Sequence, residues 1–106
     1  MYVIPTNKDA KLAISGLAFF RNRKATLSGG FHRDIPSYLG RLDTEAFREL
    51  VEAFNNKDRD ASVYIVKSYS TPIAWCDANG EWHIPRVSYT PTTTRHQSIV
   101  RMAVNA

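Results

Sequence analysis

The sequence lacks most of the features that would set it apart from ordinary small globular proteins. It has a single cysteine, Cys76, so no disulfide can form within the chain, and a lone thiol is typical of a reducing compartment. No apolar run approaches the roughly 20 residues that a membrane-spanning helix needs. The first residues also lack the basic and apolar regions of a secretory signal. These absences predict a cytoplasmic protein with no membrane partner.

The common catalytic and nucleotide-binding motifs are missing as well. The chain contains no G-x-x-x-x-G-K-[ST] loop, no G-x-G-x-x-G turn and no G-x-S-x-G elbow. Its three histidines, His32, His83 and His96, are too scattered to give a metal-ligand spacing with one cysteine. We therefore expect no metal site and no cofactor, and we favour a binding protein over an enzyme.

The residues that are present predict one folded domain over residues 1–106. The chain is 43% hydrophobic and 23% charged, which is the balance of a globular protein with one modest core. A stripe of helical period follows Asp43, whose carboxylate can cap the helix, and it consists of Ala46, Phe47, Leu50, Val51 and Phe54. Residues 63–66 are apolar throughout, as in a strand covered on both faces. This combination predicts the α+β class: a small, mostly antiparallel sheet with two to three helices packed on it.

A central hairpin is expected over about residues 72–85. Asn79-Gly80 lies in a short polar connection, where glycine accepts a positive φ at little cost. With a four-residue loop, Trp75 would lie opposite Trp82 on one face, whereas a three-residue loop would separate the two indoles. The tryptophans are either core residues or a stacking platform for bases, and the sequence leaves both interpretations open.

The strongest candidate site lies where the last helix is expected to begin. One of Thr92, Thr93 and Thr94 can cap this helix, and Arg95 and His96 follow in its first turn. Helix N-termini attract anions because free N–H groups and the macrodipole point outward there. The hydroxyls, the guanidinium and the imidazole together predict an anion-binding site. In the competing interpretation one threonine is only a cap and His96 is a core histidine.

Three residues outside this helix, Tyr69, Arg86 and Tyr89, are expected to be neighbours of the site. The alternative from another class is a small nuclease or phosphotransfer enzyme, with His96 as acid or base, Arg95 on the phosphate and Tyr89 nearby. The sequence offers no evident second acid or base for that reaction. A protein–protein inhibitor that uses the aromatic hairpin is the third alternative.

The net charge of +4 is unevenly distributed along the chain. The first 42 residues are rich in lysine and arginine, and residues 43–60 are mainly acidic. A basic turn formed by Arg21, Arg23 and Lys24, between Phe20 and Phe31, predicts a small nucleic-acid patch, with an ordinary exposed turn as the alternative. A basic surface favours anionic partners such as nucleotides and nucleic acids.

The C-terminal half carries a recognisable pattern. It reads SYSTPIAW at residues 68–75, then Trp82 and Pro85, then SYTPTTTRHQ at residues 88–97. This pattern resembles a small uncharacterised protein family of bacteriophages and actinobacteria, and the resemblance covers mainly residues 63–103. It implies a phage or mobile-element origin, hence the host cytoplasm, and it carries over no catalytic role. By analogy, it also suggests an inhibitor of host machinery or defence.

The leading hypothesis is a non-enzymatic, phage-type binding protein. Its ligand is an anionic small molecule, such as a nucleotide, or a nucleic acid, held at the start of the last helix. A ligand sponge or an inhibitor acting against host defence fits this hypothesis. A host protein target and a homodimer stay open as further partners.

Overall fold

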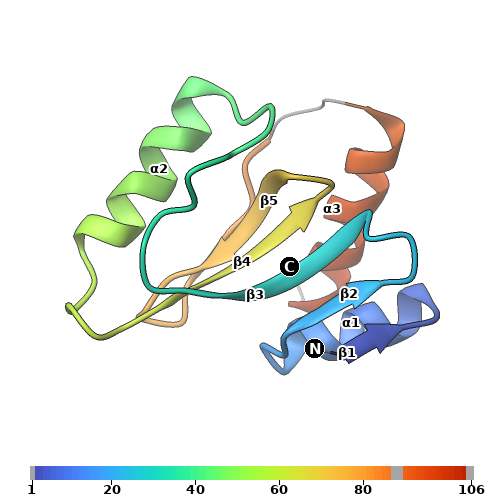
Figure 1. The fold of residues 1–106 in the computed structure, drawn as a ribbon. Helices are drawn as coiled ribbons and strands as arrows, with labels where there is room; N and C mark the ends of the chain where they lie inside the picture. Colours follow the sequence, from blue (N-terminus) through green and yellow to red (C-terminus); the bar gives the residue numbers. More distant parts are fainter. Residues whose placement is uncertain (1, 87–89, 105–106) are drawn as a thin grey trace.

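The computed structural model describes residues 2–86 and 90–104, and these residues form three helices and six strands (Figure 1). The α+β class predicted from the sequence is confirmed. No helix in the described ranges is long and apolar enough to cross a membrane. In chain order the elements are β1 (Tyr2–Ile4), α1 (Asn7–Ser15), β2 (Phe20–Asn22), β3 (Leu27–His32), α2 (Thr44–Asn55), β4 (Val63–Ser68), β5 (Thr71–Cys76), β6 (Trp82–His83) and α3 (Pro91–Ala103).

The strands form one sheet in the order β1-β2-β3-β4-β5-β6. β1 and β2 are parallel and are connected through α1, whereas every later neighbouring pair is antiparallel. β3 and β4 therefore lie at the centre of the sheet. The predicted hairpin forms as β5 and β6, but it lies at one end of the sheet and not at its centre.

Helices cover both faces of the sheet, with α2 on one face and α1 and α3 on the other (Figure 1). Side chains alternate between the two faces along each strand, so the sheet separates two cores. The smaller core under α2 consists of Ala46, Leu50, Val63, Ile65 and Trp75. The larger core under α1 and α3 includes Ile14, Phe20, Tyr64, Ile73 and Val100. β4 contributes to both cores, as predicted for residues 63–66.

α2 begins where the sequence predicts it, because the Asp43 carboxylate accepts a hydrogen bond from the backbone N–H of Ala46 at 2.7 Å. Leu50 in the middle of the apolar stripe is fully buried. Phe47 differs from the prediction, since its side chain is 41% exposed. The sheet residues in the core under α2 come from β4 and β5 alone. This contact area is too narrow to cover the edge of the apolar stripe, where Phe47 lies.

The β5–β6 hairpin separates the two tryptophans. Trp75 pairs with His83 and Cys76 pairs with Trp82, so the loop runs over residues 77–81. Trp75 is fully buried in the core under α2, and Trp82 packs on the opposite face, 5.9 Å from Tyr64 between ring centroids. The pairing expected for a four-residue loop is therefore wrong, and Trp75 is a core residue.

Asp77 explains the longer loop. Its Oδ1 accepts hydrogen bonds from the backbone N–H groups of Asn79 and Glu81, at 2.9 and 3.0 Å. Gly80 takes up the positive φ of 85° that the turn requires. The Asn-Gly signal predicted the turn correctly, but the aspartate side chain set its length.

Candidate functional site

α3 begins earlier than the sequence analysis expected. Thr90 is its N-cap, because the Thr90 Oγ1 accepts a hydrogen bond from the backbone N–H of Thr93 at 3.1 Å. Pro91 is the first helical residue, a position that suits proline because its φ is already helical and no N–H is needed there. The expected cap at Thr92, Thr93 or Thr94 is therefore wrong.

The helical period decides which side chains of α3 face the interior. Thr93, His96 and Gln97 are buried, whereas Thr94 and Arg95 are exposed. Residues three and four apart share one face of a helix, which explains the grouping. The five consecutive residues that the sequence placed in one site are thus divided between two faces.

His96 is held in the interior by a hydrogen bond to β4. Its Nδ1 lies 2.7 Å from the Ser68 Oγ, and the Ser68 Oγ lies 3.4 Å from the Thr93 Oγ1. Burial, and then the neighbouring charge of Arg95, lower the pKa of His96 below its ordinary value of 6.5. The imidazole is therefore mainly neutral at pH 7, and it connects α3 to the sheet.

A hollow of about 420 Å³ opens at the N-terminal end of α3, and we call it the α3 pocket. Its walls come from the start of α3, from the turn between β4 and β5, and from the loop that precedes α2. Its volume lies within the range of small-molecule binding sites. The lining residues are Tyr38, Gly40, Arg41, Ser68, Tyr69, Ser70, Thr71, Thr90, Thr92 and Thr93.

Three of the predicted site residues, Thr92, Thr93 and Tyr69, line the α3 pocket. Tyr69 sits in the β4–β5 turn with a φ of 57°, and its side chain is 57% exposed. His96 is not a lining residue. It lies behind the pocket, where it contacts Ser68.

The other predicted residues lie elsewhere. Thr94, Arg95 and Arg86 are exposed, and none of them lines the α3 pocket. Arg95 is exposed because the helical period places it away from the face formed by Thr93, His96 and Val100. Tyr89 falls outside the described residues.

The sequence analysis missed Tyr38 and Arg41, which the loop before α2 brings to the pocket. The backbone N–H of Arg41 donates a hydrogen bond to the Thr71 Oγ1 at 2.8 Å, across 30 positions of sequence. Gly40, with a φ of 58°, allows the loop to contact Thr71 closely. In the sequence, the one signal for this loop was the glycine between Tyr38 and Arg41. No sequence pattern indicates that the loop contacts the β4–β5 turn.

The α3 pocket is rich in hydrogen-bond donors, and no Asp or Glu of the described residues lines it. The helix itself supplies few of these donors. Pro91 has no N–H, and the N–H of Thr93 donates to the Thr90 side chain. The capping hydrogen bonds therefore leave the backbone N–H of Thr92 without an acceptor. Most lining side chains carry a hydroxyl, and Arg41 supplies the positive charge.

The residues of the predicted basic turn, Arg21, Arg23 and Lys24, do not all line one hollow. Arg21 on β2 lines a hollow of about 350 Å³ on the sheet, together with Phe19, His32 and Lys67, and we call it the sheet hollow. It lies on the α2 face, over the strands that α2 leaves uncovered. Arg23 and Lys24 are exposed and do not line this hollow. Of the predicted patch, Arg21 lines the sheet hollow and Arg23 and Lys24 do not.

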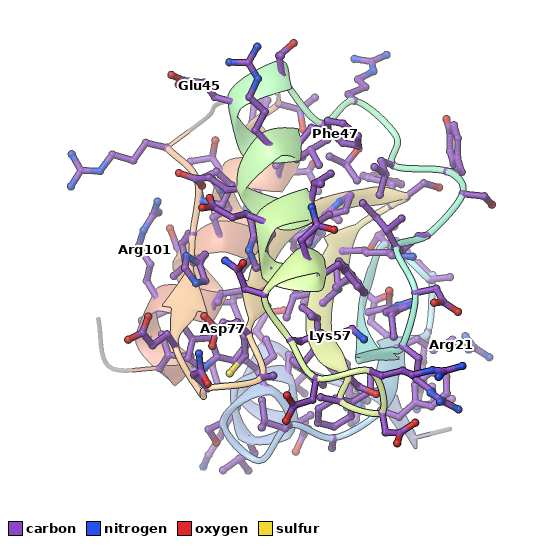
Figure 2. All side chains as sticks on the ribbon, turned by 90° about the vertical axis from the view of Figure 1, so that its left-hand side faces the viewer. Arg21, Glu45, Phe47, Lys57, Asp77 and Arg101 are labelled. Atoms are coloured by element: carbon purple, nitrogen blue, oxygen red, sulfur yellow. The ribbon has the colours of Figure 1, made fainter. Side chains whose placement is uncertain are left out.

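A polar hollow of about 370 Å³ lies on the other side of α2, beside the hairpin loop, and we call it the acidic hollow. Its lining includes four carboxylates, Glu49, Glu52, Asp77 and Glu81, and the imidazole of His83. Figure 2 looks onto α2 and shows Asp77 and Arg21 on opposite sides of Lys57.

Asp77, Glu81 and His83 form a group in the described residues that could hold a metal ion, with ligand atoms within 4.8 Å of one another. The Nε2 of His83 lies 2.9 Å from the Asp77 Oδ2. Burial alone would raise the pKa of Asp77, but the hydrogen bonds from His83 and from the N–H groups of Glu81 and Asn79 lower it. The sequence analysis expected no metal site because the three histidines are far apart in the sequence. The hairpin loop instead brings one histidine, His83, close to two carboxylates of the same loop.

Comparison with known proteins identifies a family but no activity. The model of a family of unknown function, DUF8033, matches residues 39–101, which include every lining residue of the α3 pocket except Tyr38. No curated protein and no solved structure matches the chain. The match agrees with the resemblance to an uncharacterised family. The chain belongs to the DUF8033 family, a family of unknown function.

Proposed function

We propose that this protein binds an anionic, phosphate-bearing ligand of the nucleotide class in the α3 pocket and does not convert it. The observation that carries the proposal is the lining of the pocket. It combines one guanidinium, two tyrosines and many hydroxyls with no carboxylate among the described residues. A pocket of that composition neutralises and hydrogen-bonds an anion.

Arg41 is the residue expected to hold the phosphate. A guanidinium presents several donors in a planar arrangement that matches phosphate oxygens. The ion pairs in the described part of the chain join Arg33 to Asp60 and His83 to Asp77, so Arg41 is not in one of them. Its guanidinium is therefore available to a ligand, and the Thr92 N–H and the nearby hydroxyls add further donors.

The two tyrosines of the pocket favour a nucleotide over other anions. Tyr38 is 68% exposed and Tyr69 is 57% exposed, although both line the pocket. Aromatic rings that stay in solvent beside a cation are well suited to stacking on a nucleobase. Inorganic phosphate alone would leave these rings unused, so a nucleotide fits the pocket better than a simple anion.

An enzyme that uses Ser68 and His96 is the second candidate, because their 2.7 Å contact pairs a hydroxyl with a neutral imidazole. Such a pair resembles a nucleophile and its base. Ser68 is only 1% exposed, however, and its Oγ is also near Thr93. A nucleophile needs access to its substrate, so this geometry supports a structural role for the pair.

The aromatic hairpin gives less support to a protein–protein inhibitor. Trp75 is fully buried, and Trp82 is half-buried and packs against Tyr64. The hairpin therefore presents no pair of exposed indoles to a partner. An inhibitor of a host protein would have to use another surface.

The biological setting that we propose follows from the sequence pattern of residues 68–97. A phage-encoded binding protein that sequesters a nucleotide would act as a sponge against a host defence pathway. Purification of the protein from host cells, followed by mass spectrometry of the released small molecules, tests this setting. A nucleotide in equimolar amount supports it, and a protein that carries none contradicts it.

The pocket is tested by thermal denaturation and calorimetry with nucleotides and dinucleotides. A bound ligand at about 100 times its Kd stabilises the fold by about 2.7 kcal/mol. Arg41→Gln should weaken binding by about 1.5–3 kcal/mol, since it removes a charged hydrogen bond. Arg95→Gln is the matched control, because it removes the same charge from the exposed face of α3 and should leave affinity unchanged.

Two outcomes would count against the proposal. If Arg95→Gln weakens binding and Arg41→Gln does not, the ligand lies outside the α3 pocket. If chromatography of the incubated ligand shows conversion that His96→Ala abolishes, the protein is an enzyme. His96→Gln separates loss of chemistry from loss of folding, because the amide can still bond to Ser68.

A further inference from the structure

The α3 pocket is one end of a longer depression. A hollow of about 500 Å³ shares Tyr38, Tyr69 and Ser70 with the α3 pocket. The same hollow shares Ser28, His32 and Lys67 with the sheet hollow. The three hollows therefore adjoin, and they lead from the start of α3 across β4 and β3 to β2. We call this path the basic groove.

Positive charge runs along the basic groove without carboxylates to balance it. Arg41 lies at one end, Lys67 lies in the middle beside the titratable His32, and Arg21 lies at the other end. None of the residues from the described ranges that line the three hollows is Asp or Glu. The Arg21 guanidinium donates a hydrogen bond to the neighbouring carbonyl of Asn22, at 3.3 Å, and takes part in no ion pair among the described residues.

The two titratable groups in the middle of the groove have lowered pKa values. Burial lowers the pKa of Lys67. Burial, and then the charge of Lys67, lower the pKa of His32 below 6.5. Each charged form is thus disfavoured in the free protein, and a bound anion would stabilise both. Neither Lys67 nor His32 takes part in an ion pair among the described residues, so a bound anion would supply the counter-charge that Lys67 lacks there.

Exposed aromatic rings accompany the charges. Phe19 lines the sheet hollow and is 58% exposed, and it lies over β3, since an added Cβ at Gly30 would be 3.4 Å from its Cδ1. Tyr38 and Tyr69 occupy the opposite end of the groove. Phe31 also lines the sheet hollow and is 54% exposed, but its ring packs edge-on against Tyr64, at 5.2 Å between centroids.

We infer that the basic groove binds a short single-stranded nucleic acid, with one end in the α3 pocket and the chain running past Lys67 to Arg21. This inference rests on the proposed function and names its ligand as an oligonucleotide. A cationic path with interspersed aromatic rings is the pattern of sequence-independent single-strand binding. An acidic peptide would neutralise the cations but would leave the rings without stacking partners, and a duplex hides its bases.

The length of the ligand gives the first test. Fluorescence anisotropy is measured with labelled oligothymidylates of about two, four and eight nucleotides, because single-strand sites begin at about four. Affinity should rise with length. For the longest strand, Lys67→Gln and Arg21→Gln should each reduce the salt dependence of binding by about 0.7 in log–log slope, as for one lost phosphate contact. Phe19→Ala should weaken binding by about 5- to 150-fold, as for one lost stacked base.

Matched variants separate the groove from general charge. Arg23→Gln removes the same charge two residues from Arg21 but outside the sheet hollow, and it should leave the affinity unchanged. Arg41→Gln should weaken strands of every length, whereas Lys67→Gln and Arg21→Gln should affect only the longer ones. Circular dichroism and thermal denaturation of each variant confirm that the fold is retained.

Three results would overturn the inference. Equal affinity for all lengths, with Arg41→Gln weakening each one, would leave the α3 pocket as a nucleotide site without an extension. Competition by polyglutamate as strong as by oligothymidylate would identify an acidic protein as the partner. An absence of binding at every length, with nucleotides also unbound, would contradict both the groove and the pocket.

Discussion

The acidic hollow and the basic groove lie on opposite sides of α2, and they treat charge in opposite ways (Figure 2). In the acidic hollow, Asp77 bonds to His83 and to two backbone N–H groups of its own loop. In the basic groove, Lys67, Arg21 and Arg41 take part in none of the ion pairs of the described residues.

This contrast indicates where a ligand is needed. Polar groups that satisfy one another stabilise a loop and need no ligand, because their hydrogen bonds are already made. Charges that are partly buried beside other charges of the same sign are unfavourable until a counter-charge arrives. The groove is therefore the better candidate for function, although the acidic hollow contains the more familiar ligand residues of a metal site.

The largest effect is expected from loosening α2, which forms a wall of the acidic hollow and no part of the groove. Leu50 is fully buried, so Leu50→Ala should lower the free energy of unfolding by about 2–5 kcal/mol, measured in urea. Ligand affinity below the unfolding transition should not change. A parallel loss of affinity would show that the two regions are coupled. Phe47→Ala, at a position 41% exposed, is the milder control.

A glycine in each region gives the next comparison. At Gly40, beside the α3 pocket, φ is 58° and an added Cβ would meet the Thr71 hydroxyl and lie 2.9 Å from the Thr71 N. Gly40→Ala should therefore cost about 1–3 kcal/mol and weaken ligand binding. Gly80→Ala, at a φ of 85° with open space around the Cβ, should cost about 1–2 kcal/mol from the backbone alone. Equal effects on affinity would argue against a role for the pocket.

Replacing Asp77 should change the free energy of unfolding by a smaller amount. Asp77→Asn keeps an acceptor for the loop amides and weakens only the contact with His83, so it should cost about 0.5–1.5 kcal/mol of stability. Asp77→Ala should cost more, because the N–H groups of Asn79 and Glu81 then lose their acceptor. Neither variant should change binding in the basic groove. A strong stabilisation of the wild type by zinc, lost in both variants, would instead make the acidic hollow a metal site.

The smallest effect is expected from acid. The pKa of His96 is lowered below 6.5 in the folded protein, so the unfolded chain takes up a proton more readily at this position. This contribution to stability is present above pH 6.5 and is lost as the pH falls toward the folded-state pKa. The lowered pKa of His32 acts in the same direction. Denaturation curves of the wild type and His96→Gln between neutral and mildly acidic pH should diverge, and parallel curves would contradict this assignment.

Local signals predicted much of the fold. The Asp43 cap and the apolar stripe after it specified α2, and the continuous apolar run at 63–66 specified a central strand, since both depend on neighbours within a few residues. The predicted start of α3 was wrong, because Thr92, Thr93 and Thr94 are equally suited to cap a helix and the cap is instead Thr90, followed by Pro91. With Thr90 as the cap, Arg95 is the fifth residue of α3 and lies on its exposed face, beyond the first turn in which the sequence analysis placed it.

Local sequence features were sufficient to predict a basic α+β protein with capped helices, an Asn-Gly turn near residue 80 and a threonine-rich helix start. Long-range packing brings Arg41 and Tyr38 together with Tyr69 and Thr92 around one pocket, which Lys67 extends toward Arg21. The two kinds of feature differ in the range of the interactions that produce them. Caps and periodicity act over a few residues, whereas the pocket depends on a loop that hydrogen-bonds to a turn 30 positions away.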